Sequence, residues 1–251
     1  MVVISILILG IWSVEFLVFR FVVSKSLFAA QLARLLAGFI IFNFCYYFGF
    51  IHSDFLNFGD LSAMASPVYW LGIGETETWK TVSVGFLFSI SLVTFLSLYI
   101  PNKKLLKRPK WSFQWFFIIL FLALINAAIE EILYRLIPLS VGNLSPATLA
   151  LCSGIAFGLP HYFGHPSKWL GIILAGFLGW FLAKSVLETQ GIFLAFLFHW
   201  VQDILIIGIL SMSKKTSIYR DITEDKKVFI KGILPTTITL IVLSAFTYFA
   251  I

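Results

Sequence analysis

The chain of 251 residues is 60% hydrophobic and 12% charged, and it carries a formal net charge of +6. Soluble domains average about 45–50% apolar and about 25% charged residues, and a domain of this size has too little interior to bury such an apolar excess. The composition therefore excludes a secreted disulfide scaffold, a disordered chain and a nucleic-acid-binding protein. It predicts an integral membrane protein in contact with membrane lipids.

Apolar runs of about 20 residues predict transmembrane helices, because that length crosses the hydrocarbon core of a bilayer. We expect a single helical domain over residues 1–251, an all-α polytopic bundle of about eight helices with a buried polar site. In chain order the runs are 2–21, 27–47, 81–99, 112–139, 147–162, 169–186, 192–212 and 233–250. The first run contains Glu15 and has no basic leader or cleavage signal, so we expect it to be a retained helix and not a signal peptide.

The distribution of basic residues predicts the orientation of these helices. Fourteen of the 18 Lys and Arg residues lie in the odd-numbered connections, and such residues collect on the cytoplasmic side. Both termini should thus lie outside, and the poorly basic connection before residue 81 should be an external loop. The excess of Lys over Arg and the 28 Phe residues are typical of AT-rich genomes and favour a bacterial plasma membrane.

Charged residues inside the predicted helices need a partner or a function, because each costs about 2.5–3.5 kcal/mol at membrane depth. Glu15 and Arg34 lie at equal distances on either side of the first turn, which favours a structural ion pair between them. The 112–139 run contains two adjacent carboxylates, Glu130 and Glu131, and is therefore the more informative case.

These two carboxylates should face different ways, because neighbouring side chains on a helix point about 100° apart. Glu131 precedes Arg135 by four residues, which is the favourable order for a helical salt bridge. Asn126 lies four residues before Glu130 on the same face. Glu130 is thus a candidate general base, and pairing of both acids with other basic groups is an equally open interpretation.

Two further polar patterns contain histidine. Pro160 disturbs the helix just before His161, which is by default an interfacial or core residue, and His165 either pairs with it or belongs to a loop. His199 and Asp203 are four residues apart on one helical face. Asp203 can orient His199, or both can face a common ion or substrate, and a structural hydrogen bond is the alternative.

The polar patterns together predict one buried site formed by Glu130, His161, His199 and Asp203. Two imidazoles with one or two carboxylates would activate water, either through a bound metal or with the glutamate as the direct base. The combination therefore indicates hydrolysis.

Straight helices would not bring these residues to one depth. With a turn near residues 142–146, Glu130 and His161 would differ in depth by roughly 8 Å at 1.5 Å per residue. Proline and glycine allow bends in membrane helices. We therefore expect the helices to bend or break at Pro138, Gly154, Gly158 or Pro160.

Three motifs are similar to those of the CPBP family, the CAAX proteases and bacteriocin-processing enzymes. They are Glu130-Glu131-x-x-x-Arg135, which resembles EExxxR, Phe157-x-x-x-His161, which resembles FxxxH, and His199-x-x-x-Asp203, which resembles HxxxN or HxxxD. The resemblance covers residues 113–211, the expected catalytic core, whereas the first hundred residues match only as hydrophobic helices.

The resemblance implies an intramembrane endopeptidase of the CAAX-protease type, acting on peptides or proteins with a membrane-associated or lipidated segment. By this resemblance Glu130 and His161 activate the attacking water, while His199 and Asp203 stabilise the oxyanion or bind a metal. Three further residues are expected to support the site, namely Glu131, Arg135 and Asn126.

The resemblance leaves open whether the implied enzyme contains a metal ion. The family is usually labelled as metalloproteases, and if zinc is bound its ligands would be His161, His199 and Glu130; a glutamate-type mechanism without metal is the alternative. Many members have Asn where this chain has Asp203. Because an ionised Asp only accepts hydrogen bonds, Asp203 must be protonated, orient His199 or bind a metal, and of these roles we favour the orienting one.

Two other functions compete with proteolysis at this stage. Buried carboxylates also form ion paths, so an ion- or proton-coupled transporter is one alternative. A non-catalytic bacteriocin-immunity protein with the same fold is the other.

Overall fold

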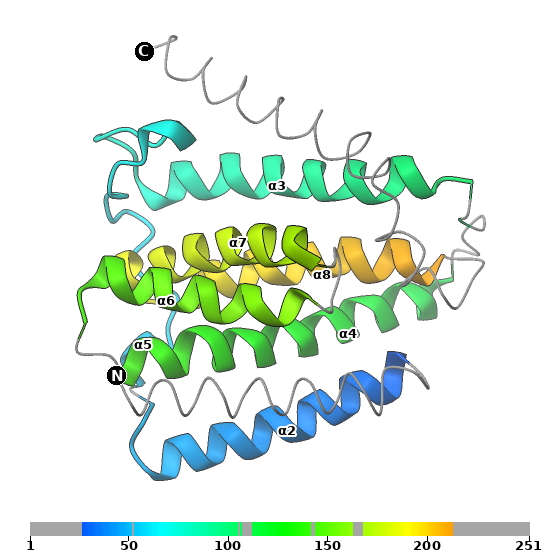
Figure 1. Cartoon of the computed structure of the whole chain (residues 1–251), viewed down its shortest axis with the longest axis horizontal. Coiled ribbons are helices and arrows are strands. Elements are labelled where there is room, and N and C mark those ends of the chain that lie inside the picture. Colours follow the sequence, from blue (N-terminus) through cyan, green and yellow to red (C-terminus); the bar gives the residue numbers. More distant parts are fainter. Residues whose placement is uncertain are drawn as a thin grey trace. The chain divides into compact units, whose positions relative to one another are not determined.

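The structure, a computed structural model, describes residues 27–51, 53–104, 106, 112–141, 144–162 and 168–212. Helices dominate these ranges (Figure 1), and the β pairing within them consists of two isolated bridges. The predicted all-α class is therefore confirmed. Several predictions fall outside the described residues, namely the helices at 2–21 and 233–250 and the side chains of Glu15, Arg34 and His165.

Six helical segments in the described ranges coincide with predicted runs to within a few residues. They are α2 (Leu27–Tyr47), α3 (Trp79–Asn102), α4 (Phe113–Glu131), α6 (Pro146–Gly158), α7 (Lys168–Thr189) and α8 (Phe193–Ser211). Four of the segments, those beginning near residues 79, 113, 169 and 193, are long and apolar enough to cross a membrane. An integral membrane protein is thus confirmed, whereas the count of about eight helices is not.

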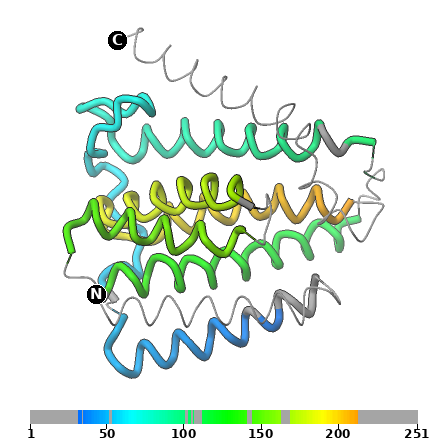
Figure 2. Tube along the Cα trace, in the orientation of Figure 1, coloured from blue at the N-terminus to red at the C-terminus, as the bar shows by residue number. Residues whose placement is uncertain are grey.

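The described residues form two compact units. The first contains those up to Gly59 and those from Leu120 to Trp200, and the second contains Asp60–Ile119 and those from Val201 onward. The chain passes from one unit to the other within α4 and again within α8, a path that can be followed along the tube in Figure 2. Most of the predicted site residues therefore belong to the first unit.

In the second unit, the side chain of Gln202 joins α8 to α3. Its amide oxygen accepts a hydrogen bond from Thr94 Oγ1 at 2.5 Å, and its Nε2 donates to Ser91 Oγ at 3.2 Å. The connection before α3 contains the short 3₁₀ helix η3 (Tyr69–Leu71), which follows the expectation of a loop. These polar contacts fix α3 against the end of α8 inside an apolar environment.

In the first unit, α6 and α7 lie side by side and approach closely through glycine (Figure 1). A Cβ atom added at Gly154 would lie 2.7 Å from the carbonyl oxygen of Gly176, and one added at Gly158 would lie 2.5 Å from that of Ile172. No larger residue fits these positions without moving the backbone. Packing of this kind drives helix association in membranes, where apolar burial supplies little force.

The α-helical pattern of α4 changes directly after the two glutamates. A π-helical turn, η4 (Ile132–Leu136), leads into the short helix α5 (Ile137–Val141), which contains Pro138. Proline has no N–H to donate to the carbonyl four residues earlier, that of Tyr134. This carbonyl instead accepts a hydrogen bond from Ser153 Oγ of α6 at 2.6 Å, so the group freed by proline is satisfied by a neighbouring helix.

A second departure from α-helical geometry lies next to His161. Helix α6 ends at Gly158, and the chain continues in the 3₁₀ helix η5 (Leu159–Tyr162), which contains Pro160. A 3₁₀ helix rises about 2.0 Å per residue instead of about 1.5 Å. The expected breaks are thus confirmed at two of the predicted positions, beside Pro138 and at Pro160.

The turn between α7 and α8 is held by the segment that follows α2, which includes the 3₁₀ helix η2 (Ser53–Phe55). Asn57 Nδ2 donates a hydrogen bond to the carbonyl oxygen of Gln190 at 2.9 Å, and the N–H of Ile192 donates one to the carbonyl oxygen of Phe55 at 3.0 Å. A Cβ atom at Gly191 would lie 2.2 Å from the nitrogen of Gly59. This tight contact fixes the start of α8, the helix that carries His199.

Candidate active site

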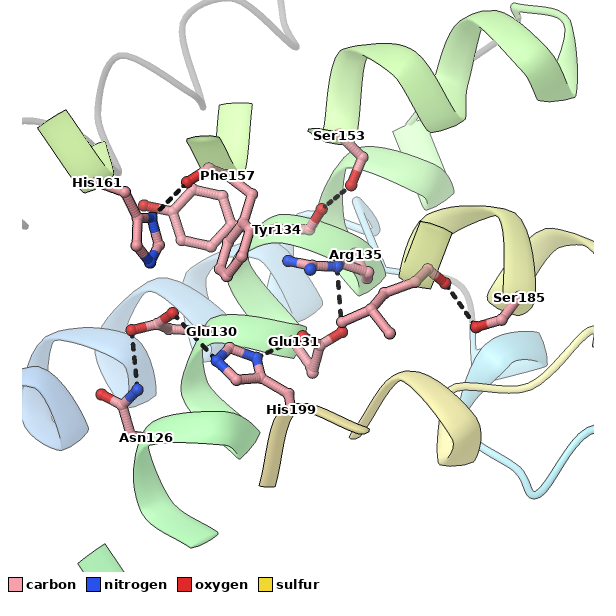
Figure 3. A network of polar contacts seen from close by, with 11 residues as sticks. Asn126, Glu130, Glu131, Tyr134, Arg135, Ser153, Phe157, His161, Ser185 and His199 are labelled. Atoms are coloured by element: carbon pink, nitrogen blue, oxygen red, sulfur yellow. Dashed lines mark hydrogen bonds and ion pairs between the residues drawn. The ribbon is translucent and has the colours of Figure 1, made fainter. Parts of the chain in front are cut away.

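Five buried side chains of the first unit form a linear series of polar contacts, which we call the polar chain (Figure 3). Helix α4 supplies two glutamates and an asparagine, the π-helical turn supplies an arginine, and α8 supplies a histidine. In contact order, the members are Arg135, Glu131, His199, Glu130 and Asn126, with exposed fractions of 0%, 1%, 4%, 6% and 7%. Burying polar groups so deeply is costly unless they are paired. Each of these five side chains contacts at least one other member of the polar chain.

The imidazole of His199 lies between the two adjacent glutamates. Its Nδ1 is 2.7 Å from Glu131 Oε1, and its Nε2 is 3.5 Å from Glu130 Oε2. Neighbouring side chains that point about 100° apart on α4 thus reach opposite edges of a single ring on α8. The sequence predicted separate partners for the two acids and missed this shared one.

The outer oxygens of the two glutamates have the partners that helical spacing predicted. Asn126 Nδ2 donates to Glu130 Oε1 at 3.0 Å. Arg135 Nε lies 3.2 Å from Glu131 Oε2, an ion pair that lacks the alignment of a hydrogen bond. Because Arg135 lies in the π-helical turn, it is displaced from the ideal i, i+4 direction. The predicted Glu131–Arg135 pair is confirmed, and Asn126, which was expected only to share a face with Glu130, forms a hydrogen bond to it.

His161 lies at the 3₁₀ helix η5 and is half-buried, so it is more accessible than the polar chain. Its Nδ1 is 2.8 Å from the carbonyl oxygen of Phe157. A carbonyl oxygen only accepts, so Nδ1 carries the proton and Nε2 is left as an acceptor. In Figure 3 the ring points toward the Glu130 end of the polar chain.

Asp203 is buried in α8, four residues after His199, and belongs to the second unit. The sequence assigned the orientation of His199 to this carboxylate. In the structure Glu131 holds Nδ1 of His199 and Glu130 faces Nε2, so the orienting contact comes from α4. Two carboxylates of α4 thus lie at the ring nitrogens of His199, and the orienting role of Asp203 stays a prediction.

The predicted metal ligands do not converge in this arrangement. Within the described ranges, no three side chains of the His, Cys, Asp and Glu types are placed so that they could share a metal ion. Of the predicted donors, His199 directs both nitrogens at carboxylates and His161 directs Nδ1 at a carbonyl. These donors therefore do not fit zinc as they stand, and we derive no chemical step from it.

Residues 111–205 match the family model of the type II CAAX prenyl endopeptidase Rce1-like proteins. The resemblance to the CPBP family predicted from the motifs is confirmed by this match over residues 111–205. The matched region contains all three motifs and the whole polar chain, and the match supports a CAAX-type intramembrane peptidase in general terms. No curated protein and no solved structure gives a match to the chain.

One supporting residue of the matched region was not predicted from the sequence. Ser153 is fully buried and donates to the carbonyl of Tyr134, within the turn that follows the glutamates. The signal for this contact was present in Pro138, because a proline leaves the carbonyl four residues earlier without its helical donor. The identity of the replacement donor depends on how α6 packs, which the sequence alone does not give.

Proposed function

We propose that this chain is an intramembrane endopeptidase that hydrolyses peptide bonds in membrane-associated or lipidated substrates. The observation that carries the proposal is the setting of Glu130. This carboxylate is buried, it is held at one oxygen by Asn126 and it faces His199 with the other, within a segment that matches a family of endopeptidases.

In the proposed reaction, Glu130 is the general base. It takes one proton from the attacking water and returns that proton to the leaving amine. The second O–H of the water stays on the attacking oxygen and donates a hydrogen bond to Nε2 of His161. The hydrogen bond from Asn126 fixes the rotamer of Glu130. A base held in place needs little reorganisation when the water attacks the carbonyl carbon.

His199 is proposed to stabilise the oxyanion of the tetrahedral intermediate. Glu131 accepts from Nδ1, so the ring can carry a proton on Nε2 as well and donate it to the developing charge. Arg135 neutralises the charge of Glu131. Asp203 is retained as a fourth proposed catalytic residue; with the orientation of His199 supplied by Glu131, its proposed role is to donate to the oxyanion as a neutral acid.

The position of these residues favours a particular class of substrate. Glu130 and His199 lie in helices that are long and apolar enough to cross a membrane. A peptide bond must therefore reach these helices within or near the bilayer, which a soluble peptide does at a high desolvation cost. A peptide with an attached lipid or an apolar segment partitions into the membrane and reaches them directly.

The test uses purified protein in detergent and a fluorogenic peptide with and without a C-terminal prenyl group. Glu130→Gln and His161→Ala should each lower kcat by about 10³-fold or more, in line with loss of a general base and of its partner. The matched control is Glu75→Gln, which alters an exposed acid in the connection before α3. Unchanged cleavage by Glu130→Gln would refute the proposal, and Glu130-dependent ion flux in proteoliposomes without proteolysis would favour a transporter.

A further inference from the structure

The ring of Phe157 contacts side chains from all three motifs. The guanidinium carbon of Arg135 lies 4.1 Å from the ring centroid. The imidazole centroids of His161 and His199 lie at 4.7 Å and 5.4 Å, with interplanar angles of 56° and 80°. Tyr134 packs edge-on at 5.4 Å. One buried phenyl ring thus touches both motif histidines and the motif arginine.

The contact with Arg135 explains how this cation is accommodated. Its two terminal amino groups have no hydrogen-bond partner within the described part of the chain. The face of an aromatic ring carries partial negative charge and attracts a guanidinium within about 6 Å. The Phe157 ring therefore supplies the favourable electrostatic contact that hydrogen bonds do not, and Arg135 in turn limits how far the ring can move.

The ring of Phe157 also lies against the backbone of α7. A Cβ atom at Gly179 would lie 2.9 Å from Phe157 Cδ1, closer than side-chain contacts allow. Gly179 therefore has to be glycine for the ring to occupy its present position. The ring is confined between α7 and the polar chain, and its orientation is fixed by both.

We infer that Phe157 is a positioning residue that sets the relative orientation of the His161 and His199 imidazoles. The inference rests on the proposed function, because it assigns a role within that reaction. Phe157 contributes in two ways: its carbonyl oxygen fixes Nδ1 of His161, and its ring packs against both imidazoles. Displacing the ring should misplace the groups that contact water and oxyanion without altering any of them.

The first test replaces the ring and compares the result with a matched buried phenylalanine. Phe157→Leu should lower kcat by about 10²-fold with KM within about threefold, the loss expected when catalytic groups shift by roughly 1 Å. Phe181→Leu is the control, because Phe181 is equally buried and packs on Phe198 instead of a motif residue. Equal losses of kcat in the two variants would mean that Phe157 only fills space, and would overturn the inference.

The second test moves the Phe157 ring without changing the identity of any motif residue. Gly179→Ala should push the Phe157 ring and lower kcat by about tenfold. Gly176→Ala, on the same helix, places its Cβ 3.4 Å from the carbonyl oxygen of Gly154 and should leave kcat unchanged. If Phe157→Leu does not fold, the comparison of Gly179→Ala with Gly176→Ala still tests the positioning role of Phe157. Full activity of Gly179→Ala would contradict the inference.

A measurement independent of activity separates this inference from the proposed function. An aromatic ring shifts the proton resonances of groups packed against it, so the His161 and His199 ring protons should move toward free-histidine values in Phe157→Leu but not in Phe181→Leu. Unmoved resonances would overturn the positioning role even if the enzyme is active. A wild-type protein that shows the shifts and cleaves no peptide would refute the proposed function alone.

Discussion

Replacing each of the two neighbouring glutamates of the polar chain by glutamine should have different effects. Glu131→Gln should mainly lower stability, and Glu130→Gln should mainly lower activity. Glu131→Gln removes the counter-ion of Arg135, a fully buried guanidinium whose ion-pair partner in the described part of the chain is Glu131. Leaving a buried charge uncompensated costs about 3–5 kcal/mol. Glu130→Gln keeps that ion pair and preserves the oxygen that accepts from Asn126, so its cost should be below about 1 kcal/mol.

The assay is thermal unfolding in detergent, read beside peptide cleavage. For a chain of this size about 1 kcal/mol corresponds to roughly 2–4 °C, so Glu131→Gln should lower Tm by about 10 °C and Glu130→Gln by less than about 3 °C. The loss of cleavage activity should be larger for Glu130→Gln than for Glu131→Gln. Glu130→Gln should abolish cleavage, whereas Glu131→Gln, measured well below its Tm, should retain a reduced rate.

A double variant tests whether the lost stability comes from the uncompensated charge. Replacing Arg135 by Met in the Glu131→Gln background removes the cation and keeps an apolar side chain of similar length, which often restores stability in buried ion pairs. We expect the double variant to unfold at a higher temperature than Glu131→Gln alone. A wild-type Tm for Glu131→Gln, or a further loss in the double variant, would refute the reasoning.

Two other predictions concern the π-helical turn and the metal. Ser153→Ala should lower the free energy of unfolding by about 1–3 kcal/mol, because it removes the buried hydrogen bond that Ser153 donates to the carbonyl of Tyr134 in a neighbouring segment. Ser185→Ala removes a hydrogen bond to a carbonyl three residues earlier in its own helix and should cost clearly less in the same unfolding assay. Since the predicted zinc ligands do not converge, cleavage should survive dialysis against a chelator, and activity restored specifically by added zinc would contradict this expectation.

Contacts within one helix were predictable from the sequence, and contacts between helices were not. The Asn126–Glu130 and Glu131–Arg135 pairs follow from four-residue spacing on a single helix, whose geometry is nearly invariant. The Glu131–His199 contact joins residues 68 positions apart and depends on the rotation and depth at which α4 and α8 pack. Periodicity carries no information on either quantity.

The role of Asp203 illustrates what spacing alone leaves open. Its four-residue separation from His199 makes it the nearest local partner for the imidazole. In the structure two glutamates from α4 lie at the ring nitrogens. An i, i+4 relation places two groups on one face of a helix, and whether Asp203 also orients His199 stays a prediction.

The π-helical turn after the glutamates has a consequence for insertions and deletions in this segment. It closes its hydrogen bonds over five residues where an α-helix uses four, so it holds one residue more than an α-helical turn. Removing one of its residues should therefore restore an uninterrupted α-helix and leave the chain after Leu136 in its present orientation. Only residues inside the turn, Tyr134 and Arg135 among them, would change their direction relative to the glutamates. A chain shortened by one residue at this point should still form a membrane-length helix and yet lose the alignment of Arg135 with Glu131.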